Sequence, residues 1–259
     1  MNVTLITGAS GGIGEAFARR LAAEKHDLFL VARSEDKLSC LCEELVASHS
    51  ISAEYFAADL AEAGADERLL AETEQRGITV DWLINNAGIG SMGDFSRLDL
   101  EREIEMIRLN VLALVSLTHR YLAGMRARGS GQIINVSSSA GFQPVPFMAT
   151  YAATKAFVTS FSEAIAEENR PFGIKVLALC PGSTKTGFFE AANIERAFTA
   201  KGQETPAQVV DTALKAVRSG RSKVVSGWTN WLVATTASVI PNSLITKAVA
   251  RGLRSRYQK

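Results

Sequence analysis

The first 24 residues hold the pattern that most restricts the fold of this chain. Residues 2–7 are a short β-branched run typical of a strand, and residues 15–24 have the apolar periodicity of a helix. The turn between them contains four glycines: Gly8, Gly11, Gly12 and Gly14. Glycines permit a tight turn and let backbone N–H groups approach a pyrophosphate at the helix N-terminus. We therefore expect a dinucleotide-binding α/β fold, with a plain glycine turn as the alternative.

Strand-like and helix-like segments continue to alternate along the chain. The pattern predicts further strands at 26–31, 53–57, 80–84, 131–138, 173–180 and 223–225. It predicts helices at 34–48, 61–76, 99–128, 150–170 and 206–219. Such alternation indicates a doubly wound, Rossmann-type parallel sheet with helices on both faces, whose ligands bind at the carboxyl ends of the strands.

Composition excludes several classes of protein. The 259 residues are 47% apolar and 21% charged, an ordinary globular profile, and the net charge of +1 gives no strong field to recruit nucleic acid. A strand that begins at Asn2 leaves no room for a secretory or transit segment, so a cytoplasmic location is expected. Cys40, Cys42 and Cys180 are expected to be free thiols.

No metal site is expected. Cys40 and Cys42 are too closely spaced for a usual zinc pair and have no second pair nearby. His119 has no acid or cysteine at ligand spacing, and His26 and His49 stand near the ends of elements.

The end of the second predicted strand indicates the cofactor. An NAD-preferring site usually places an acidic residue there to hold the ribose 2′-hydroxyl, whereas this chain has Ala32 and Arg33. A guanidinium suits a 2′-phosphate, so Arg33 predicts NADP(H), with a solvated loop cation as the alternative. Ser34 is expected to cap the next helix. Asp59, after the third strand, either accepts a hydrogen bond from adenine or caps the helix that follows.

Tyr151 and Lys155 lie four residues apart, hence on one face of a predicted helix, and Ser138 lies thirteen residues before Tyr151 at a strand end. A nearby ammonium group favours the phenolate, so Tyr151 is a plausible proton donor or acceptor at neutral pH. Taken alone, a Tyr and a Lys at this spacing are usually a surface pair. Asn110 interrupts the apolar face of the 99–128 helix and needs a partner, either in the site or in the next strand.

Together these motifs resemble the short-chain dehydrogenase/reductase family over about residues 2–226. The motifs that carry the resemblance are Thr7-Gly8-x-x-x-Gly12-Ile13-Gly14, Asn85-Asn86-Ala87-Gly88, Asn110, Ser138, Tyr151-x-x-x-Lys155 and Pro181-Gly182. The tail from 227 to 259 fits less well, and a hydrophobic tail after such a core is similar to the branch loosely described as DltE-like.

The resemblance implies a seven-stranded sheet in the order 3-2-1-4-5-6-7 and a catalytic tetrad. Tyr151 would exchange a proton with the substrate oxygen and Ser138 would hold that oxygen. Lys155 would lower the pKa of Tyr151 and bind the nicotinamide ribose, and Asn110 would position a water behind Lys155. The residues expected at the cofactor, besides Tyr151 and Lys155, are Gly8, Ser10, Gly12, Ile13, Gly14, Arg33, Ser34, Asp59, Leu60, Asn86, Ala87, Gly88, Pro181, Gly182, Thr184 and Thr186. One departure is Gly11, where many NADP-preferring members have a basic residue, so the 2′-phosphate depends mainly on Arg33.

The substrate pocket is predicted from residues near Ser138 and Tyr151 and from a lid at 187–205, a long connection of the kind that often covers a site. The pocket candidates are Phe142, Pro144, Phe147 and Met148, with Phe188, Phe189 and Phe198 from the lid and Trp228 and Trp231 from the tail. Few of them are charged, which favours an apolar or aromatic ketone or aldehyde. Several of these aromatics are equally consistent with ordinary core.

Three interpretations of the tail stay open. The apolar run 228–240 is too short to span a bilayer and is followed by Pro241 and by Arg251, Arg254, Arg256 and Lys259. It covers the pocket or a subunit interface, lies on a membrane surface as an amphipathic helix, or is partly disordered.

The sequence thus predicts an NADP(H)-dependent carbonyl reductase or alcohol dehydrogenase, with residues 1–226 as the catalytic domain and 227–259 as an extension. A homodimer or homotetramer formed through helices 99–128 and 150–170 is implied by the resemblance. The alternatives are a non-catalytic dinucleotide sensor on the same fold and a methyltransferase. The latter normally needs an acid where Ala32 and Arg33 stand.

Overall fold

A seven-stranded parallel sheet runs through the centre of the protein in the order β3-β2-β1-β4-β5-β6-β7, which confirms the predicted topology. The computed structural model describes residues 1–188, 203–237 and 240–257. The strands are β1 (Asn2–Thr7), β2 (Leu28–Ala32), β3 (Ala53–Ala57), β4 (Thr79–Asn85), β5 (Gly131–Val136), β6 (Ile174–Cys180) and β7 (Lys223–Val225).

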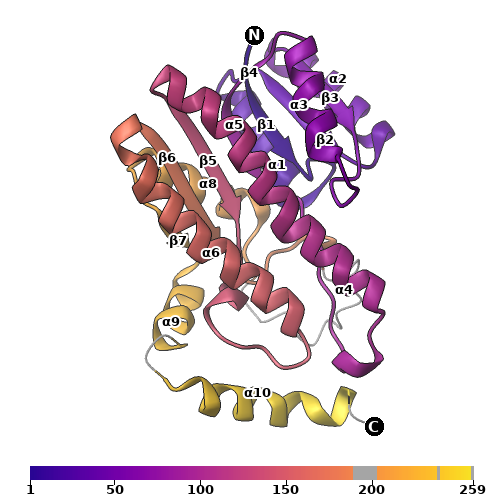
Figure 1. Ribbon diagram of the computed structural model, residues 1–259, viewed down its shortest axis with the longest axis vertical. Helices are drawn as coiled ribbons and strands as arrows, with labels where there is room; N and C mark the ends of the chain where they lie inside the picture. Colours follow the sequence, from indigo (N-terminus) through magenta and orange to yellow (C-terminus); the bar gives the residue numbers. More distant parts are fainter. Residues whose placement is uncertain (189–202, 238–239, 258–259) are drawn as a thin grey trace.

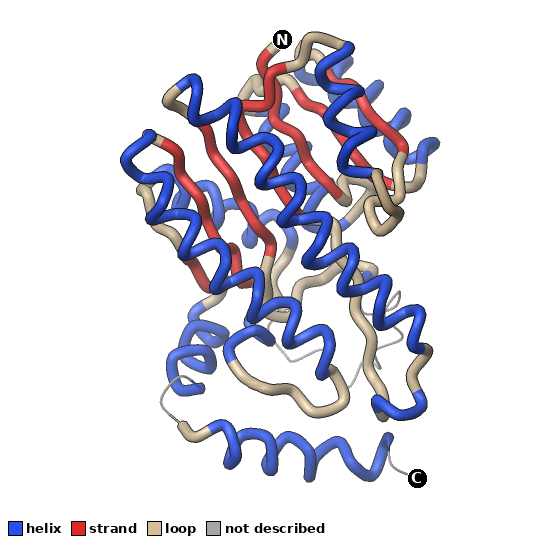
Figure 2. The backbone as a smooth tube through the Cα atoms, viewed as in Figure 1, coloured by secondary structure: helices blue, strands red, loops and turns tan. Residues whose placement is uncertain are grey.

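Helices cover both faces of the sheet (Figures 1 and 2). One face packs against α1 (Gly12–Ala23), α2 (Glu35–His49) and α8 (Pro206–Arg218). The other packs against α3 (Ala65–Gln75), α5 (Leu114–Arg128) and α6 (Ala149–Asn169). Strand β2 explains how one short segment serves both layers. Leu28 and Leu30 point to the first layer, whereas Phe29 and Val31 point to the second, because successive strand residues alternate between faces.

The predicted single helix over 99–128 is divided into three parts. It comprises α4 (Leu100–Ile107), a π-helical turn over Arg108–Ala113 and α5. Isolated π turns inside α-helices are often found at functional sites, since they displace one residue from the regular hydrogen-bond ladder. The displaced turn contains Asn110, whose side-chain amide bonds outside the helix to the backbone of Ile89.

Two predicted helix caps differ from the structure. Ser34 occupies the N-cap position of α2, but its side chain makes no capping hydrogen bond. Asp59 does not cap α3, because that helix begins only at Ala65, with Gly64 as its N-cap. Asp59 instead accepts a hydrogen bond from the backbone N–H of Ala61, 2.9 Å away, and fixes the turn after β3.

The tail forms two helices, α9 (Trp228–Ala237) and α10 (Asn242–Tyr257). Figure 1 shows α10 lying across the end of the molecule toward which the strands β5 and β6 point. Its inner side contributes Leu253 to an apolar cluster with Met92, Met106, Met148 and Tyr151, which we call the site cluster. Short 3-10 turns occur at Phe95–Arg97, Ser139–Phe142 and Arg170–Phe172. None of the described helices is both long enough and apolar enough to cross a membrane.

Candidate active site

The glycine turn after β1 forms a cradle for a phosphate group. Gly8 and Gly12 have φ angles of 65° and 59°, in the left-handed region that favours glycine. A Cβ on Gly14 would overlap the carbonyl oxygen of Gly8, so α1 can start this close to β1 only with glycine there. A Cβ on Gly11 would meet nothing within 4 Å, so the backbone faces open space at the N-terminus of α1. This combination of open space, unused N–H groups and a helix N-terminus fits a pyrophosphate.

The loop after β4 is fixed against the glycine turn. The Asn86 side chain donates to the carbonyl oxygens of Thr7 and Gly8, at 2.9 and 3.2 Å, and the Ala87 N–H donates to the Thr7 hydroxyl at 3.0 Å. From the far side, the methyl group of Thr186 lies 3.2 Å from the position of a Cβ on Gly12. Three segments expected at the cofactor therefore meet at the carboxyl ends of β1 and β4, where the strand order reverses.

The adenine end contains an ion-pair cluster around Arg33. Its guanidinium lies 3.5 Å from a carboxylate oxygen of Asp59 and 3.6 Å from one of Glu105, and its side chain is 59% exposed. Asp59, Leu60 and Glu105 line a hollow of about 590 Å³ beside this cluster. Arg33 thus lies where a 2′-phosphate is expected, but two carboxylates neutralise it in the cofactor-free protein. Glu105 is a member of this cluster that the sequence reasoning missed.

Tyr151 and Ser138 lie together in a nearly dry environment. Tyr151 is 8% exposed and Ser138 is 9% exposed. Burial raises the pKa of Tyr151, and a hydrogen bond with the Ser138 side chain opposes that rise. Ser138 follows β5, and its hydroxyl oxygen also accepts from the N–H of Ala140, which fixes its direction. The phenol is therefore protonated at neutral pH and pre-oriented by a second hydroxyl.

Lys155 lies one helical turn after Tyr151 and is only 5% exposed. Its ammonium donates to the carbonyl oxygen of Val136 at 2.9 Å and lies 5.8 Å from the centre of the Tyr151 ring. Burial lowers the pKa of Lys155 to about 8. The pKa of Tyr151 is therefore raised in the cofactor-free protein, not lowered as expected, because burial is the largest influence on the phenol.

Asn110 and Lys155 meet at Gly88. A Cβ on Gly88 would lie 3.0 Å from Asn110 Oδ1 and 3.4 Å from Lys155 Nζ. Asn110 Oδ1 accepts from the Ile89 N–H at 3.0 Å, while Nδ2 donates to the Ile89 carbonyl at 2.9 Å and to the Thr154 hydroxyl at 3.2 Å. Asn110 therefore ties the loop after β4 to α6. The structure brings together all four residues predicted as catalytic. Asn110 finds its partners in the loop after β4 and on α6, not in the next strand, β5.

The residues predicted for the substrate pocket divide into two groups. Met148 belongs to the site cluster, Phe147 packs against it, and the Phe188 ring lies 5.5 Å from that of Tyr151. Phe142 instead lies under the Lys223 ammonium at 5.7 Å, and Pro144 is exposed. Trp228 and Trp231 are 77% and 56% exposed, so their assignment to the pocket was wrong. Phe189, Phe198 and most of the predicted lid lie outside the described residues.

Sequence reasoning missed several residues beside Tyr151. A Cβ on Gly90 would lie 2.7 Å from the Phe188 ring and 3.4 Å from that of Tyr151, so only glycine lets the two rings pack this close to the loop after β4. Glu103 is buried and accepts a hydrogen bond from the Ser91 hydroxyl. For Gly90 and Ser91 the only available signal was their position shortly after the Asn85–Gly88 motif. From the tail, Tyr257 stacks 5.2 Å from Phe147, a long-range contact with no local signature.

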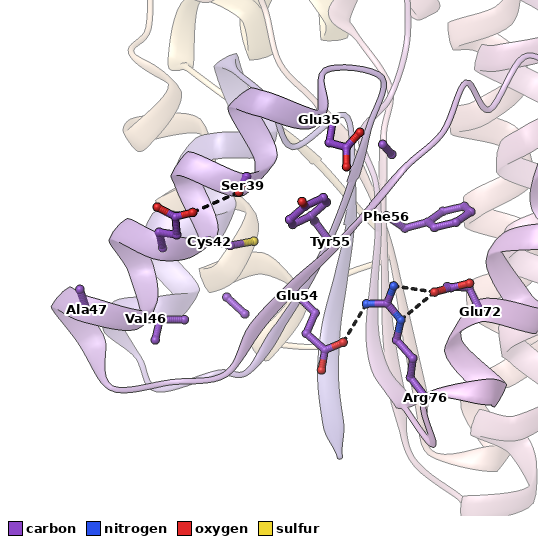
Figure 3. A pocket seen from close by; sticks show the side chains of 13 residues that line it. Glu35, Ser39, Cys42, Val46, Ala47, Glu54, Tyr55, Phe56, Glu72 and Arg76 are labelled. Atoms are coloured by element: carbon purple, nitrogen blue, oxygen red, sulfur yellow. Dashed lines mark hydrogen bonds and ion pairs between the residues drawn. The ribbon is translucent and has the colours of Figure 1, made fainter.

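A larger hollow, of about 980 Å³, lies elsewhere in the protein. Figure 3 shows this groove between α2, the edge strand β3 and α3, where Arg76 bonds to Glu54 and Glu72. None of the four predicted catalytic residues lines it. Size alone therefore does not mark the reactive site, whose groups converge at Tyr151.

Comparison with known proteins agrees with this geometry. The family model described as short chain dehydrogenase matches residues 2–197. The chain belongs to the short-chain dehydrogenase family. Members of this family use NAD(P)H, and the glycine cradle and the donors around it fit that group. Within the described residues, no group of three His, Cys, Asp or Glu side chains is arranged to hold a metal ion.

Two curated relatives of this short-chain dehydrogenase are ketoacyl reductases. The very-long-chain 3-oxoacyl-CoA reductase of Bos taurus is 30% identical over 98% of this chain and 81% of its own. The ketoacyl reductase HetN of Nostoc sp. is 32% identical over 85% of this chain and 77% of its own.

Two solved structures are similar over nearly the whole fold. A short-chain dehydrogenase from Sphingobium yanoikuyae in complex with NADPH has a TM-score of 0.82 at 30% identity, covering 100% of this chain and 97% of the other. The bulky-bulky ketone specific alcohol dehydrogenase of Comamonas testosteroni has a TM-score of 0.78 at 27% identity, covering 100% and 96%. The chain is therefore an oxidoreductase by family.

Proposed function

We propose that this short-chain dehydrogenase is an NADP(H)-dependent reductase of bulky apolar or aromatic ketones or aldehydes, acting also as an alcohol dehydrogenase in reverse. The observation that carries the proposal is the buried Tyr151–Ser138 pair: Tyr151 belongs to the apolar site cluster, and its ring centre lies 5.8 Å from the Lys155 ammonium. A protonated phenol in an apolar surrounding suits proton donation to a carbonyl oxygen.

The residues act on the substrate as follows. When the cofactor is bound, its nicotinamide ring supplies the hydride for the carbonyl carbon. Ser138 donates a hydrogen bond to the carbonyl oxygen and holds it beside the phenol. Tyr151 transfers its proton to that oxygen as negative charge develops there, which gives the alcohol. The nearby Lys155 ammonium stabilises the resulting phenolate. Asn110 bonds to Ile89 and to Thr154, the residue before Lys155, and so fixes the loop after β4 against this part of α6.

The test is Tyr151→Phe, which keeps the aromatic packing against Phe188 and removes the proton. We expect NADPH binding to be retained and reduction of a generic diketone to fall to background. Near-normal turnover in this variant would eliminate Tyr151 as the proton donor. A wild-type protein that binds NADPH but reduces no carbonyl in a broad panel would instead favour a dinucleotide sensor.

The preference for NADP(H) is proposed from Arg33. No acidic residue follows β2 directly, and the Arg33 side chain is exposed at the adenine end, where a guanidinium can contact a 2′-phosphate. The Sphingobium relative, solved with NADPH, supports this assignment. Arg33→Asp is expected to raise the Michaelis constant for NADPH far more than that for NADH. Equal changes for the two cofactors would remove Arg33 from the phosphate site.

The substrate class is proposed from the side chains above Tyr151. Met92, Met148, Phe147 and Phe188 are uncharged, and the Phe188 ring lies 5.5 Å from that of Tyr151. Relatives named for ketoacyl substrates and for bulky ketones support a large apolar carbonyl compound. A substrate panel should favour aromatic or long-chain ketones, and a preference for small charged keto acids would defeat this part of the proposal.

We also infer a cytoplasmic location and a homodimer or homotetramer. Support for self-association comes from exposed apolar side chains on the expected contact helices, Leu112 in the π turn and Phe157 on α6. Light scattering of the purified protein tests the oligomer directly, and a monomer would contradict it.

A further inference from the structure

The outer side of α9 is apolar and exposed. Trp228 and Trp231 are joined there by Leu232 and Val233, each more than half exposed. The inner side is anchored, since Ala234 and Ala237 are buried and Asn230 packs directly against Gly182. Single exposed apolar residues need no explanation, but four within six residues, two of them tryptophan, form a patch. The contacts of the inner side fix the orientation of α9, so the apolar side chains on its outer side point to solvent.

The outer side of α10 is cationic. Lys247, Arg251 and Arg254 are exposed and lie four and three residues apart, hence on one helix face. None of the three forms an ion pair with the described residues. Opposite them, Val249, Leu253 and Tyr257 face the protein. The sequence from 228 to 259 contains no Asp or Glu and five Lys or Arg residues, so no acid in this segment offsets the charge.

We propose that this C-terminal surface binds peripherally to an anionic lipid bilayer. The surface consists of Trp228, Trp231, Leu232, Val233, Lys247, Arg251 and Arg254. Tryptophan and aliphatic side chains partition into the headgroup region, while adjacent cations are attracted to anionic lipids. The exposed Thr235 and Thr236 hydroxyls donate to the carbonyls of Trp231 and Leu232, at 2.8 and 2.6 Å, which lowers the cost of placing them near lipid.

Charge favours lipid over a second copy of the chain as the occupant. A two-fold contact places the same patch on both subunits, so it would bring two cationic faces together with no acid in the tail to offset them. An anionic bilayer is complementary to the apolar and the basic parts at once. This docking would also place the site cluster next to the membrane, since α10 joins that cluster through Leu253.

The experiment measures sedimentation of the full-length protein with phosphatidylcholine vesicles, with and without phosphatidylglycerol. We expect binding to the anionic vesicles that weakens with added salt. Trp228→Ser combined with Trp231→Ser should lower the partition coefficient at least about tenfold, since each exposed indole loses apolar burial. Lys247→Gln, Arg251→Gln and Arg254→Gln together should lower it by roughly a hundredfold, as each cation near an anionic surface contributes about fivefold.

Matched controls separate this surface from general stickiness and net charge. Val46→Ser removes an exposed apolar residue from α2, and Lys37→Gln, Lys215→Gln and Arg221→Gln together remove three exposed cations elsewhere. Both controls should bind vesicles like the wild type. Equal loss in the controls, no vesicle binding by the wild type, or a Trp228/Trp231 variant that changes the oligomeric state but not vesicle binding would each overturn the proposal. Turnover of a water-soluble ketone should be unchanged in the tail variants, so this test is independent of the proposed reaction.

Discussion

Glu105 should limit how tightly this protein binds NADPH. In the cofactor-free state Arg33 lies between Asp59 and Glu105, and Glu105 also pairs with Arg102 at 3.4 Å. A 2′-phosphate that reaches Arg33 must displace these carboxylates or lie beside them. Glu105→Gln keeps the size and hydrogen-bonding capacity of the side chain and removes its charge. We therefore expect the variant to bind NADPH more tightly and to leave NADH nearly unaffected.

The distances set the size of the effect. Two unit charges 3.6 Å apart in a water-like dielectric interact by about 1 kcal/mol, and measured exposed pairs contribute roughly 0.2–1 kcal/mol. Arg33 is more than half exposed, so the lower, solvent-screened range applies. Relief of the pair, with removal of a carboxylate beside the phosphate, should lower the Kd for NADPH about two- to fivefold. The gain should shrink as salt is added.

Fluorescence titration with NADPH and NADH, at low and high ionic strength, measures both constants directly. Glu101→Gln is the matched control. It removes an exposed carboxylate from the same helix, and Glu101 forms no ion pair with Arg33 among the described residues. Asp59→Asn is less clean, since Asp59 also fixes the turn at Ala61. The reasoning is refuted if Glu105→Gln strengthens the binding of NADPH and NADH equally, or if it weakens the binding of NADPH.

Three further predictions concern the cradle and the relay. Gly14→Ala should lower the melting temperature by roughly 5 °C, from overpacking against the carbonyl oxygen that it faces, whereas Gly11→Ala should not, which a thermal melt of both variants decides. Asn110→Leu should cost about 2–4 kcal/mol of unfolding free energy by denaturant titration, because the N–H and the carbonyl oxygen of Ile89 both lose the Asn110 side chain as their partner. Burial lowers the pKa of Lys155 from its ordinary value of 10.5 to about 8. Between pH 8 and pH 10.5 the unfolded chain therefore keeps a proton on this lysine that the folded protein has lost. The stability of the wild type relative to Lys155→Met should therefore rise across that range, by at most about 3 kcal/mol, and a flat difference would contradict it. The comparison with the variant is needed because two buried thiols act in the opposite direction. The pKa values of Cys42 and Cys180 are raised to about 11, so their contribution to the free energy of unfolding falls as the pH rises above about 9.

The sheet could be predicted from local sequence because its signals are local. Strand β2 is buried on both faces, so it has to be apolar throughout, and a glycine turn between a strand and a helix admits few other folds. The π turn at Asn110 had no such signal, since residues 108–113 have ordinary helical composition. The π turn accompanies the two hydrogen bonds between the Asn110 side-chain amide and the backbone of Ile89, which lies on another segment of the chain.

The catalytic residues were predictable for a related reason. Tyr151 and Lys155 lie on one helix, so their spacing alone fixes their relation, and Ser138 follows the end of strand β5 by two residues. The pKa values did not follow from that spacing. The sequence suggested that Lys155 would lower the pKa of Tyr151, whereas the depth of burial of both groups controls each of them in the cofactor-free protein. The burial of Tyr151 depends on side chains from α10 and from the loop after β4. No local sequence pattern predicts that these two segments pack against the phenol.

The tail shows why apolar composition is a weak guide to position. The aromatic character of Trp228 and Trp231 predicts a place in the pocket, yet both indoles are exposed to solvent. Leu253 and Tyr257, from the more polar α10, pack at the site instead. Helical periodicity explains the outcome, because only the face of α9 with Asn230, Ala234 and Ala237 fits against the turn at Gly182. The same 32-residue segment thus has one side built for the protein and another side with no protein partner among the described residues. On the proposed bilayer contact, an extension that packs Leu253 at the site and presents tryptophans and cations on its outer face would favour a substrate that arrives from lipid over one that arrives from water.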